Sequence, residues 1–168
     1  MDVTLYIWRL SPTNVGHASL KIGDTYMSYW PAEVAGKKDV KLGQSHEAGF
    51  PSAYAVDRRL ERKHADEEFT LTDLDTAKMV AAWDQFKLTE PRYNMVDQNC
   101  STVVAVMLQV GSGLQPSFVP AVAIDDHARS LPQRIFLRLR FFSSYIKMWT
   151  PDEVLRYAQE IQSRKPLQ

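Results

Sequence analysis

The sequence has a single cysteine, no excess of charge of either sign and no long apolar run. One thiol, that of Cys100, excludes an internal disulfide and is too few for a zinc ribbon or an iron–sulfur cluster. Twenty basic and twenty acidic residues give a formal net charge of zero, which argues against nucleic acid as a partner. No stretch is apolar over the roughly 18 residues that a membrane-spanning helix needs. We therefore expect no cofactor, no metal, no nucleic-acid partner and no transmembrane segment.

The start of the sequence also lacks the basic residues and the apolar region of a secretory signal. We therefore expect a soluble protein that would leave its producing cell by a signal-peptide-independent route. With 168 residues, 45% of them hydrophobic, the chain has enough apolar side chains for a packed core. The sequence predicts a single domain over residues 1–168.

The first thirty residues predict a strand followed by a hairpin. Apolar residues alternate over residues 3–8, which is typical of a strand with one buried face. A hairpin over residues 17–30 would turn at Gly23 and the residue after it. This register places Ser28 on the same face as His17 and within reach of the His17 ring.

The remaining pattern predicts one more strand and three helices. The polar stretch 32–68 contains a predicted strand at residues 53–56. A helix capped by Thr72 follows, and an apolar run predicts a helix over residues 100–110. Thr150 opens a capping box with proline at the first helical position, which predicts the last helix.

Two further features are given structural interpretations. Arginine alternates with apolar residues over 134–142, which indicates an edge strand or a helix whose arginine stems cover apolar surface. The alternative is an anion-binding or membrane-touching patch. His46, His64 and His127 lack the spacing of metal ligands and are interpreted as surface residues.

The strongest chemical signal is the position of Cys100 directly before an apolar run. A thiol at a helix N-terminus, close to an imidazole, has a lowered pKa and becomes a good nucleophile. The hairpin offers such an imidazole in His17, which follows a glycine. We therefore predict Cys100 as a nucleophile and His17 as its base. The alternative is that Cys100 is a small buried hydrophobic residue.

Thiol-based acyl transfer also needs a group that orients the base and donors for the oxyanion. Ser28 is the candidate for orienting His17. Gln98 and Asn99, directly before the nucleophile, are candidates for donating a side-chain amide to the oxyanion. For Asn99 the alternative is a helix cap.

The order of these motifs resembles that of a known family. The segment Val15-Gly16-His17-Ala18-Ser19-Leu20, followed about 80 residues later by Tyr93-Asn94 and Asn99-Cys100, resembles the circularly permuted papain-like cysteine hydrolases. In these the histidine strand precedes the cysteine helix. They include PPPDE isopeptidases, lecithin:retinol acyltransferase-like proteins, permuted NlpC-type peptidases and bacterial toxin domains. The Gly-His-Ala-Ser-Leu motif and the start of the last helix at Trp149 look most like the bacterial secreted-effector branch of this family.

The resemblance implies an α+β fold in which an antiparallel sheet packs against helices and His17 faces Cys100 at a helix N-terminus. The third polar residue of the family corresponds to Ser28, where this chain has no histidine, amide or carboxylate.

The implied function is that of a cysteine hydrolase, an amidase or peptidase, in a bacterial toxin effector domain. Its substrate would be a peptide, peptidoglycan or a protein in the periplasm or cytoplasm of a target cell, and its partners an immunity protein or a secretion carrier. The alternatives are an acyltransferase or deamidase with the same site, or a non-catalytic interaction module.

Overall fold

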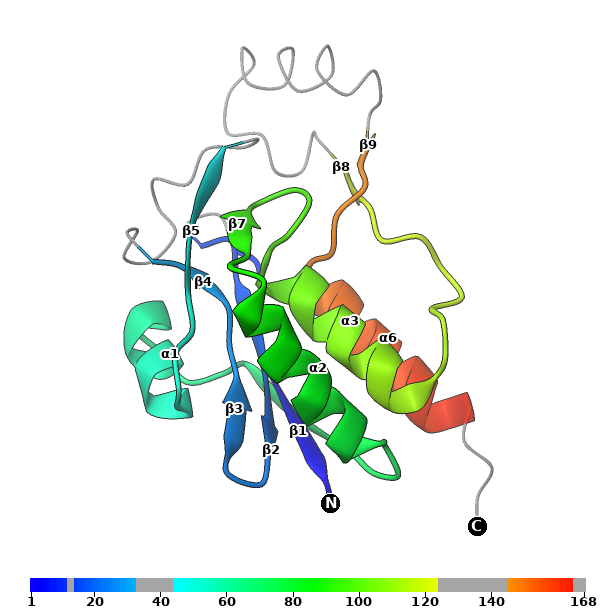
Figure 1. Ribbon diagram of the computed structural model, residues 1–168. Helices are drawn as coiled ribbons and strands as arrows, with labels where there is room; N and C mark the ends of the chain where they lie inside the picture. Colours follow the sequence, from blue (N-terminus) through cyan, green and yellow to red (C-terminus); the bar gives the residue numbers. More distant parts are fainter. Residues whose placement is uncertain (12–13, 33–43, 124–144, 165–168) are drawn as a thin grey trace.

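The fold combines antiparallel sheets with helices, which confirms the predicted α+β class (Figure 1). The computed structural model describes residues 1–11, 14–32, 44–123 and 145–164. The largest sheet has the strand order β3-β2-β1-β6, a second has the order β4-β5-β7, and β8 pairs with β9. The strands are Val3–Trp8 (β1), His17–Ile22 (β2), Thr25–Met27 (β3), Trp30–Pro31 (β4), Ser45–Gly49 (β5), Glu67–Leu71 (β6), Arg92–Asn94 (β7), Val122–Ala123 (β8) and Tyr145–Ile146 (β9). The helices are Tyr54–Glu61 (α1), Thr76–Leu88 (α2), Cys100–Ser112 (α3) and Pro151–Arg164 (α6).

One face of the largest sheet packs against helices. The alternating side chains of Val3, Leu5 and Ile7 in β1 are fully buried in a core that they share with α3 and α6. Figure 1 shows these two helices and α2 together on this side, with α2 beside α3. Each such buried side chain contributes about 1.5–3 kcal/mol. This layer therefore fixes α3 relative to β1 and β2.

The other face carries aromatic side chains and α1. Tyr54 of α1 lies 4.6 Å from Tyr6 and 5.6 Å from Trp8, measured between ring centroids. His17 is paired with Trp8 and Ser19 with Tyr6 in the antiparallel ladder of β1 and β2. Since directly paired residues share a face, His17 and Ser19 project toward α1 rather than toward α3.

The predicted hairpin is present, but its second arm is shorter than expected. Ile22 pairs with Thr25, as the two-residue turn requires, and β3 then ends at Met27. Trp30 pairs instead with Gly49 of β5, in the second sheet. The chain leaves the hairpin at Ser28, whose hydroxyl turns to a carboxylate on α1 instead of extending the ladder.

The strand predicted at residues 53–56 is wrong, because this segment begins α1. The helix has no side-chain cap, ends at Arg62 in the left-handed region (φ 60°), and buries two acidic residues, Asp57 and Glu61. A short helix whose buried face is acidic has no apolar periodicity to reveal it. Tertiary hydrogen bonds, not local pattern, therefore determine α1.

The predicted start is correct for two of the three helices and wrong for one, and α3 runs past the predicted end at residue 110 to Ser112. Asp75, not Thr72, caps α2, and its side chain accepts a hydrogen bond from the Lys78 N–H. The helix after Asn99 is present and ends at Gly113. Thr150 caps α6, because its hydroxyl accepts from the Glu153 N–H. Segment 134–142 and His127 lie outside the described residues. Within the described ranges, no helix is long and apolar enough to cross a membrane.

Candidate functional site

The candidate residues lie where β2, α3 and α6 begin, at one end of the large sheet (Figure 1). Gly16, directly before His17, has φ +73°, and a Cβ there would lie 3.0 Å from Pro151 Cγ. Asn99, directly before Cys100, donates from Nδ2 to the Trp149 carbonyl oxygen at 3.0 Å. The start of α6 thus joins the residue before the candidate base to the residue before the candidate nucleophile.

Cys100 is the first residue of α3 and is 4% exposed. The Asn99 Oδ1 atom accepts from the Thr102 N–H at 2.8 Å and so caps the helix. Both hydrogens of the Asn99 amide are also used, by the carbonyl oxygens of Met95 (2.9 Å) and Trp149 (3.0 Å). Asn99 has no donor left for an oxyanion, so its role is the alternative one, a cap, together with a tie to α6.

A tight turn leads into the nucleophile. The backbones of Asn94 and Gln98 exchange two hydrogen bonds, of 3.1 and 3.0 Å, which bring Tyr93 back beside the start of α3. Burial first, and then the charge of a Cys100 thiolate, raise the pKa of Tyr93 well above its ordinary value. Gln98 is half-buried, and its side chain lies beside the hydroxyl of Tyr29. The described contacts of Gln98 therefore link it to Tyr29.

His17 is fully buried and is paired with a carboxylate that the sequence did not reveal. Its Nε2 atom lies 3.0 Å from Asp57 Oδ2, on α1, and 3.0 Å from the hydroxyl of Ser28. The contact between Ser28 and His17 that the hairpin register predicts is thus present. Asp57 is within hydrogen-bond distance of both His17 and Ser28, and it lies in the polar stretch 32–68, where the sequence predicts no site residue.

Four donors surround the Asp57 carboxylate. Oδ2 accepts from the hydroxyl of Tyr26 at 2.7 Å as well as from His17. Oδ1 accepts from the Ser28 hydroxyl and from the Trp30 indole, both at 2.9 Å. An ionised carboxylate has no hydrogen to donate, so His17 Nε2 must carry one. When the ring is neutral, Nδ1 is then the nitrogen that can accept a proton.

The charge of Asp57 follows from the same contacts. Burial alone would raise the pKa of this carboxyl group. The positive charge of a protonated His17 and the hydrogen bonds from His17, Tyr26 and Ser28 outweigh burial and lower the pKa below its ordinary value. Asp57 is therefore ionised at neutral pH and stabilises an imidazolium at His17.

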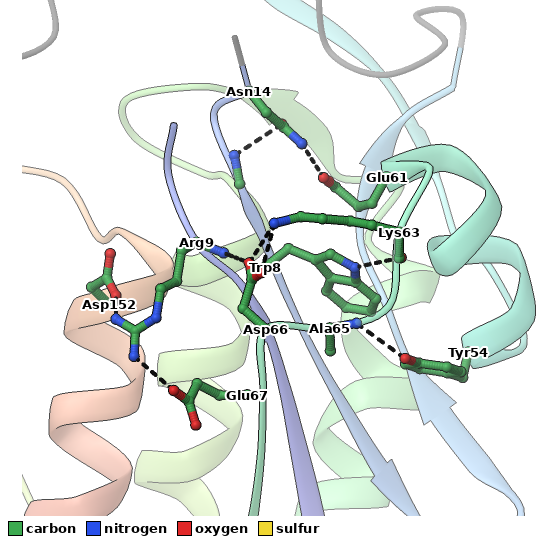
Figure 2. A network of polar contacts seen from close by, with 11 residues as sticks. Trp8, Arg9, Asn14, Tyr54, Glu61, Lys63, Ala65, Asp66, Glu67 and Asp152 are labelled. Carbon is green, nitrogen blue, oxygen red and sulfur yellow. Dashed lines mark hydrogen bonds and ion pairs between the residues drawn. The ribbon is translucent and has the colours of Figure 1, made fainter. Parts of the chain in front are cut away.

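A second network holds α1 against the sheet (Figure 2). The Trp8 indole donates to the Lys63 carbonyl oxygen at 3.1 Å, and the Ala65 N–H donates to the Tyr54 hydroxyl at 3.1 Å. Asp66 accepts from the Arg9 N–H at 2.7 Å and pairs with Lys63. The remaining contacts join Arg9 to Glu67 and Asp152, and Asn14 to Glu61. The loop after α1 is thereby fastened to the end of β1, which keeps Asp57 at His17.

His17 and Cys100 reach this end of the molecule from different sides. His17 projects toward α1, whereas α3 covers the opposite face of the sheet. His17 is the first residue of β2 and Cys100 is the first residue of α3, and both elements begin at this end of the large sheet. This is also the end at which Tyr93 and the turn before Cys100 lie.

Of the two other histidines among the described residues, His64 is a surface residue, as predicted, and His46 is not. His64 is exposed and lies 3.2 Å from the Tyr54 hydroxyl. His46, by contrast, is half-buried on β5, and its Nε2 atom is buried without a hydrogen bond to any described residue. Among the described residues, no group of three or more histidine, cysteine or acidic side chains is arranged to hold a metal ion.

Comparisons of the chain with protein-family models, with curated proteins and with solved structures found no match.

Proposed function

We propose that the protein is a cysteine-dependent hydrolase, an amidase or peptidase, with Cys100 as nucleophile, His17 as base and Asp57 as the residue that orients His17. The observation that carries the proposal is the fully buried pair of His17 Nε2 and Asp57 Oδ2, 3.0 Å apart, at the end of the sheet where α3 begins. Papain-like hydrolases, which the order of the motifs resembles, combine a cysteine and a histidine with an asparagine that orients the histidine, and we assign this third role to Asp57.

The contacts of His17 support different roles for its two ring nitrogens. Nε2 carries a proton and donates it in the hydrogen bond to Asp57, so Nδ1 would take the proton of the Cys100 thiol. The thiolate would then attack a carbonyl carbon, and the backbone N–H of Cys100, at the start of α3 and ahead of the capped Thr102 N–H, would bind the oxyanion. His17 would return the proton to the leaving amine, and water would release the acyl group from Cys100.

The cost of this arrangement also favours a functional role. Burying a carboxylate and an imidazole together costs several kcal/mol in desolvation, and apolar side chains of the same volume often stabilise a fold as well or better. A buried ionised group with a pKa shifted by a specific partner is a feature of functional sites.

The resemblance supports a more specific version of the proposal. In it the protein is a bacterial effector domain that reaches a target cell through a secretion system and cleaves a peptide, a protein or peptidoglycan there. Acyl transfer or deamidation would use the same three residues. In acyl transfer an amine would replace water as the acceptor of the acyl group, and in deamidation the leaving group would be ammonia.

One observation favours a second candidate, a non-catalytic interaction module with the same fold. Cys100 is only 4% exposed, as expected for a thiol that serves in packing. The two candidates differ in the reactivity of this thiol.

The deciding experiment is alkylation of Cys100 by iodoacetamide over a range of pH. For a hydrolase we expect a rate midpoint well below the value of about 8.5 for a free thiol, and slower labelling at neutral pH in His17→Ala. The control is His64→Ala, which removes an exposed imidazole and should leave the profile unchanged. A thiol that stays inert at neutral pH would reject the proposal.

A second experiment locates the substrate. The wild-type chain, Cys100→Ala and His17→Ala are expressed in bacteria, either in the cytoplasm or directed to the periplasm. We expect growth inhibition by the wild type alone, in the compartment that contains the substrate. Equal toxicity of all three chains would reject a thiol-based activity.

A further inference from the structure

Three buried polar atoms on or beside the sheet β4-β5-β7 make no hydrogen bond of good geometry with any described residue. They are Tyr29 Oη, His46 Nε2 and Tyr93 Oη. His46 is paired with Tyr93 in the ladder of β5 and β7, and the rings of Tyr29 and Tyr93 lie 5.4 Å apart. The three side chains therefore share one face. Native proteins leave few buried polar atoms without a partner, so a cluster of three calls for a reason.

Of these three groups, Tyr93 lies next to the nucleophile. The paired backbones of Asn94 and Gln98 extend to Tyr93 and Asn99, the residue directly before Cys100. The Tyr93 side chain is fully buried, so its hydroxyl has no access to bulk water. The Tyr29 hydroxyl, in contrast, lies beside Gln98.

The charges around Tyr93 determine what its hydroxyl can do. Besides burial and Cys100, Tyr29 and the Glu61 carboxylate on α1 raise the pKa of Tyr93. The phenol therefore keeps its proton at neutral pH and is available as a donor. The neighbouring strand β5 carries two further titratable groups, His46, which is paired with Tyr93, and Glu47, which is paired with Arg92 of β7.

We propose that the Tyr93 hydroxyl donates a hydrogen bond to the Cys100 thiolate and so stabilises the reactive form of the nucleophile. The role rests on the proposed function, in which the thiol proton passes from Sγ to His17 Nδ1; Tyr93 keeps its own proton throughout. The Tyr93 hydroxyl lies within reach of the Cys100 side chain, and no other described group accepts a hydrogen bond of good geometry from it. A bond from a neutral donor to an anion is about twice as strong as one between neutral groups.

The test compares Tyr93→Phe with the matched control Tyr29→Phe in the full chain. Both variants remove one unpartnered hydroxyl from a buried ring on the same face, so both keep the packing. The readout is the iodoacetamide rate at Cys100 against pH, with thermal unfolding to verify that each variant is folded. Tyr93→Phe should move the midpoint upward by about one pH unit, which slows labelling below the midpoint about tenfold. Tyr29→Phe should leave the midpoint unchanged.

The proposal is overturned if the midpoint of Tyr93→Phe equals that of the wild type, or if both variants move it equally. This failure is distinct from that of the proposed function, because His17→Ala is measured in the same assay. A profile that responds to His17→Ala but not to Tyr93→Phe retains the hydrolase and rejects the hydrogen bond. A profile that responds to Tyr93→Phe but not to His17→Ala retains the bond and rejects His17 as the base.

Discussion

Asp57→Asn tests the proposed site most directly, because it keeps the shape of the side chain and changes only its hydrogen-bonding capacity. The carboxylate accepts from His17, Tyr26, Ser28 and Trp30. An asparagine amide has one acceptor oxygen and a nitrogen that only donates. Whichever way it is oriented, two of the four donors face an NH2 group instead of an oxygen.

Two magnitudes follow for Asp57→Asn. Each buried donor left without an acceptor costs about 1–3 kcal/mol, and breaking a buried ion pair costs about 3–5 kcal/mol, so we expect the free energy of unfolding to fall by about 3 kcal/mol. If the amide nitrogen faces His17, Nε2 must accept and Nδ1 must carry the proton, which is the wrong tautomer for a base. The corresponding change in a serine-protease triad lowers kcat by about 10⁴-fold. We expect a loss of similar order in turnover once a substrate is known.

The assay for Asp57→Asn combines urea unfolding with the alkylation profile of Cys100. The matched control is Asp24→Asn, which makes the same change in the exposed turn between β2 and β3. We expect Asp24→Asn to keep the free energy of unfolding within about 0.5 kcal/mol of the wild type. If Asp57→Asn is as stable as this control and its thiol reacts at the wild-type rate, the assignment of Asp57 to His17 is refuted.

Three further predictions concern stability. Because the pKa of Asp57 is lower in the folded than in the unfolded state, the stability difference between wild type and Asp57→Asn should shrink as the pH falls below the ordinary value near 3.8. Urea unfolding at several acidic pH values measures this difference, and a difference that grows below that value would contradict the sign. Gly16→Ala should lower the thermal unfolding temperature more than Gly113→Ala does. Both glycines have a φ near +70°, but a Cβ at Gly16 would lie 2.5 Å from the Trp8 carbonyl oxygen, whereas one at Gly113 has no neighbour within 4 Å. Equal losses of unfolding temperature would show that the crowding at Gly16 is relieved without cost. Asn99→Asp retains the oxygen that caps α3 and loses both amide donors, so its free energy of unfolding in urea should fall by about 1–2 kcal/mol. Asn99→Ala also loses the cap, so its free energy of unfolding should fall further. Equal losses in the two variants would mean that the cap contributes nothing.

The parts of the site that depend on neighbouring residues were predictable from the sequence. The turn at Gly23 fixes the register of the hairpin up to Met27, and this register predicts that Ser28, the next residue, lies near His17. The polar residue Asn99 before an apolar run likewise predicts a capped helix that begins at Cys100.

The parts that depend on distant residues were not predictable. Asp57 is 40 positions from His17, on a helix whose buried residues are acidic, and an acidic residue in a charged stretch normally indicates a solvated surface. The choice between the two roles of Asn99 required its contact with Trp149, 50 positions away. The break in the second hairpin arm required β5, with which Trp30 pairs. The sequence signal for Asp57 was its spacing of four from Glu61, which would place both on one helix face, and the strand prediction obscured it.

The donors around Asp57 come from separate parts of the chain, and this ties reactivity to folding. His17 begins β2, Tyr26 lies in β3, Trp30 begins β4, and the acceptor sits on α1. A chain that has formed its hairpin but not yet docked α1 has an imidazole without a fixed tautomer, and hence an unactivated thiol. Nascent or partly unfolded molecules would therefore be chemically inert toward their surroundings. If the proposed function holds, local detachment of α1, which leaves the main core intact, would be enough to remove the activation of Cys100.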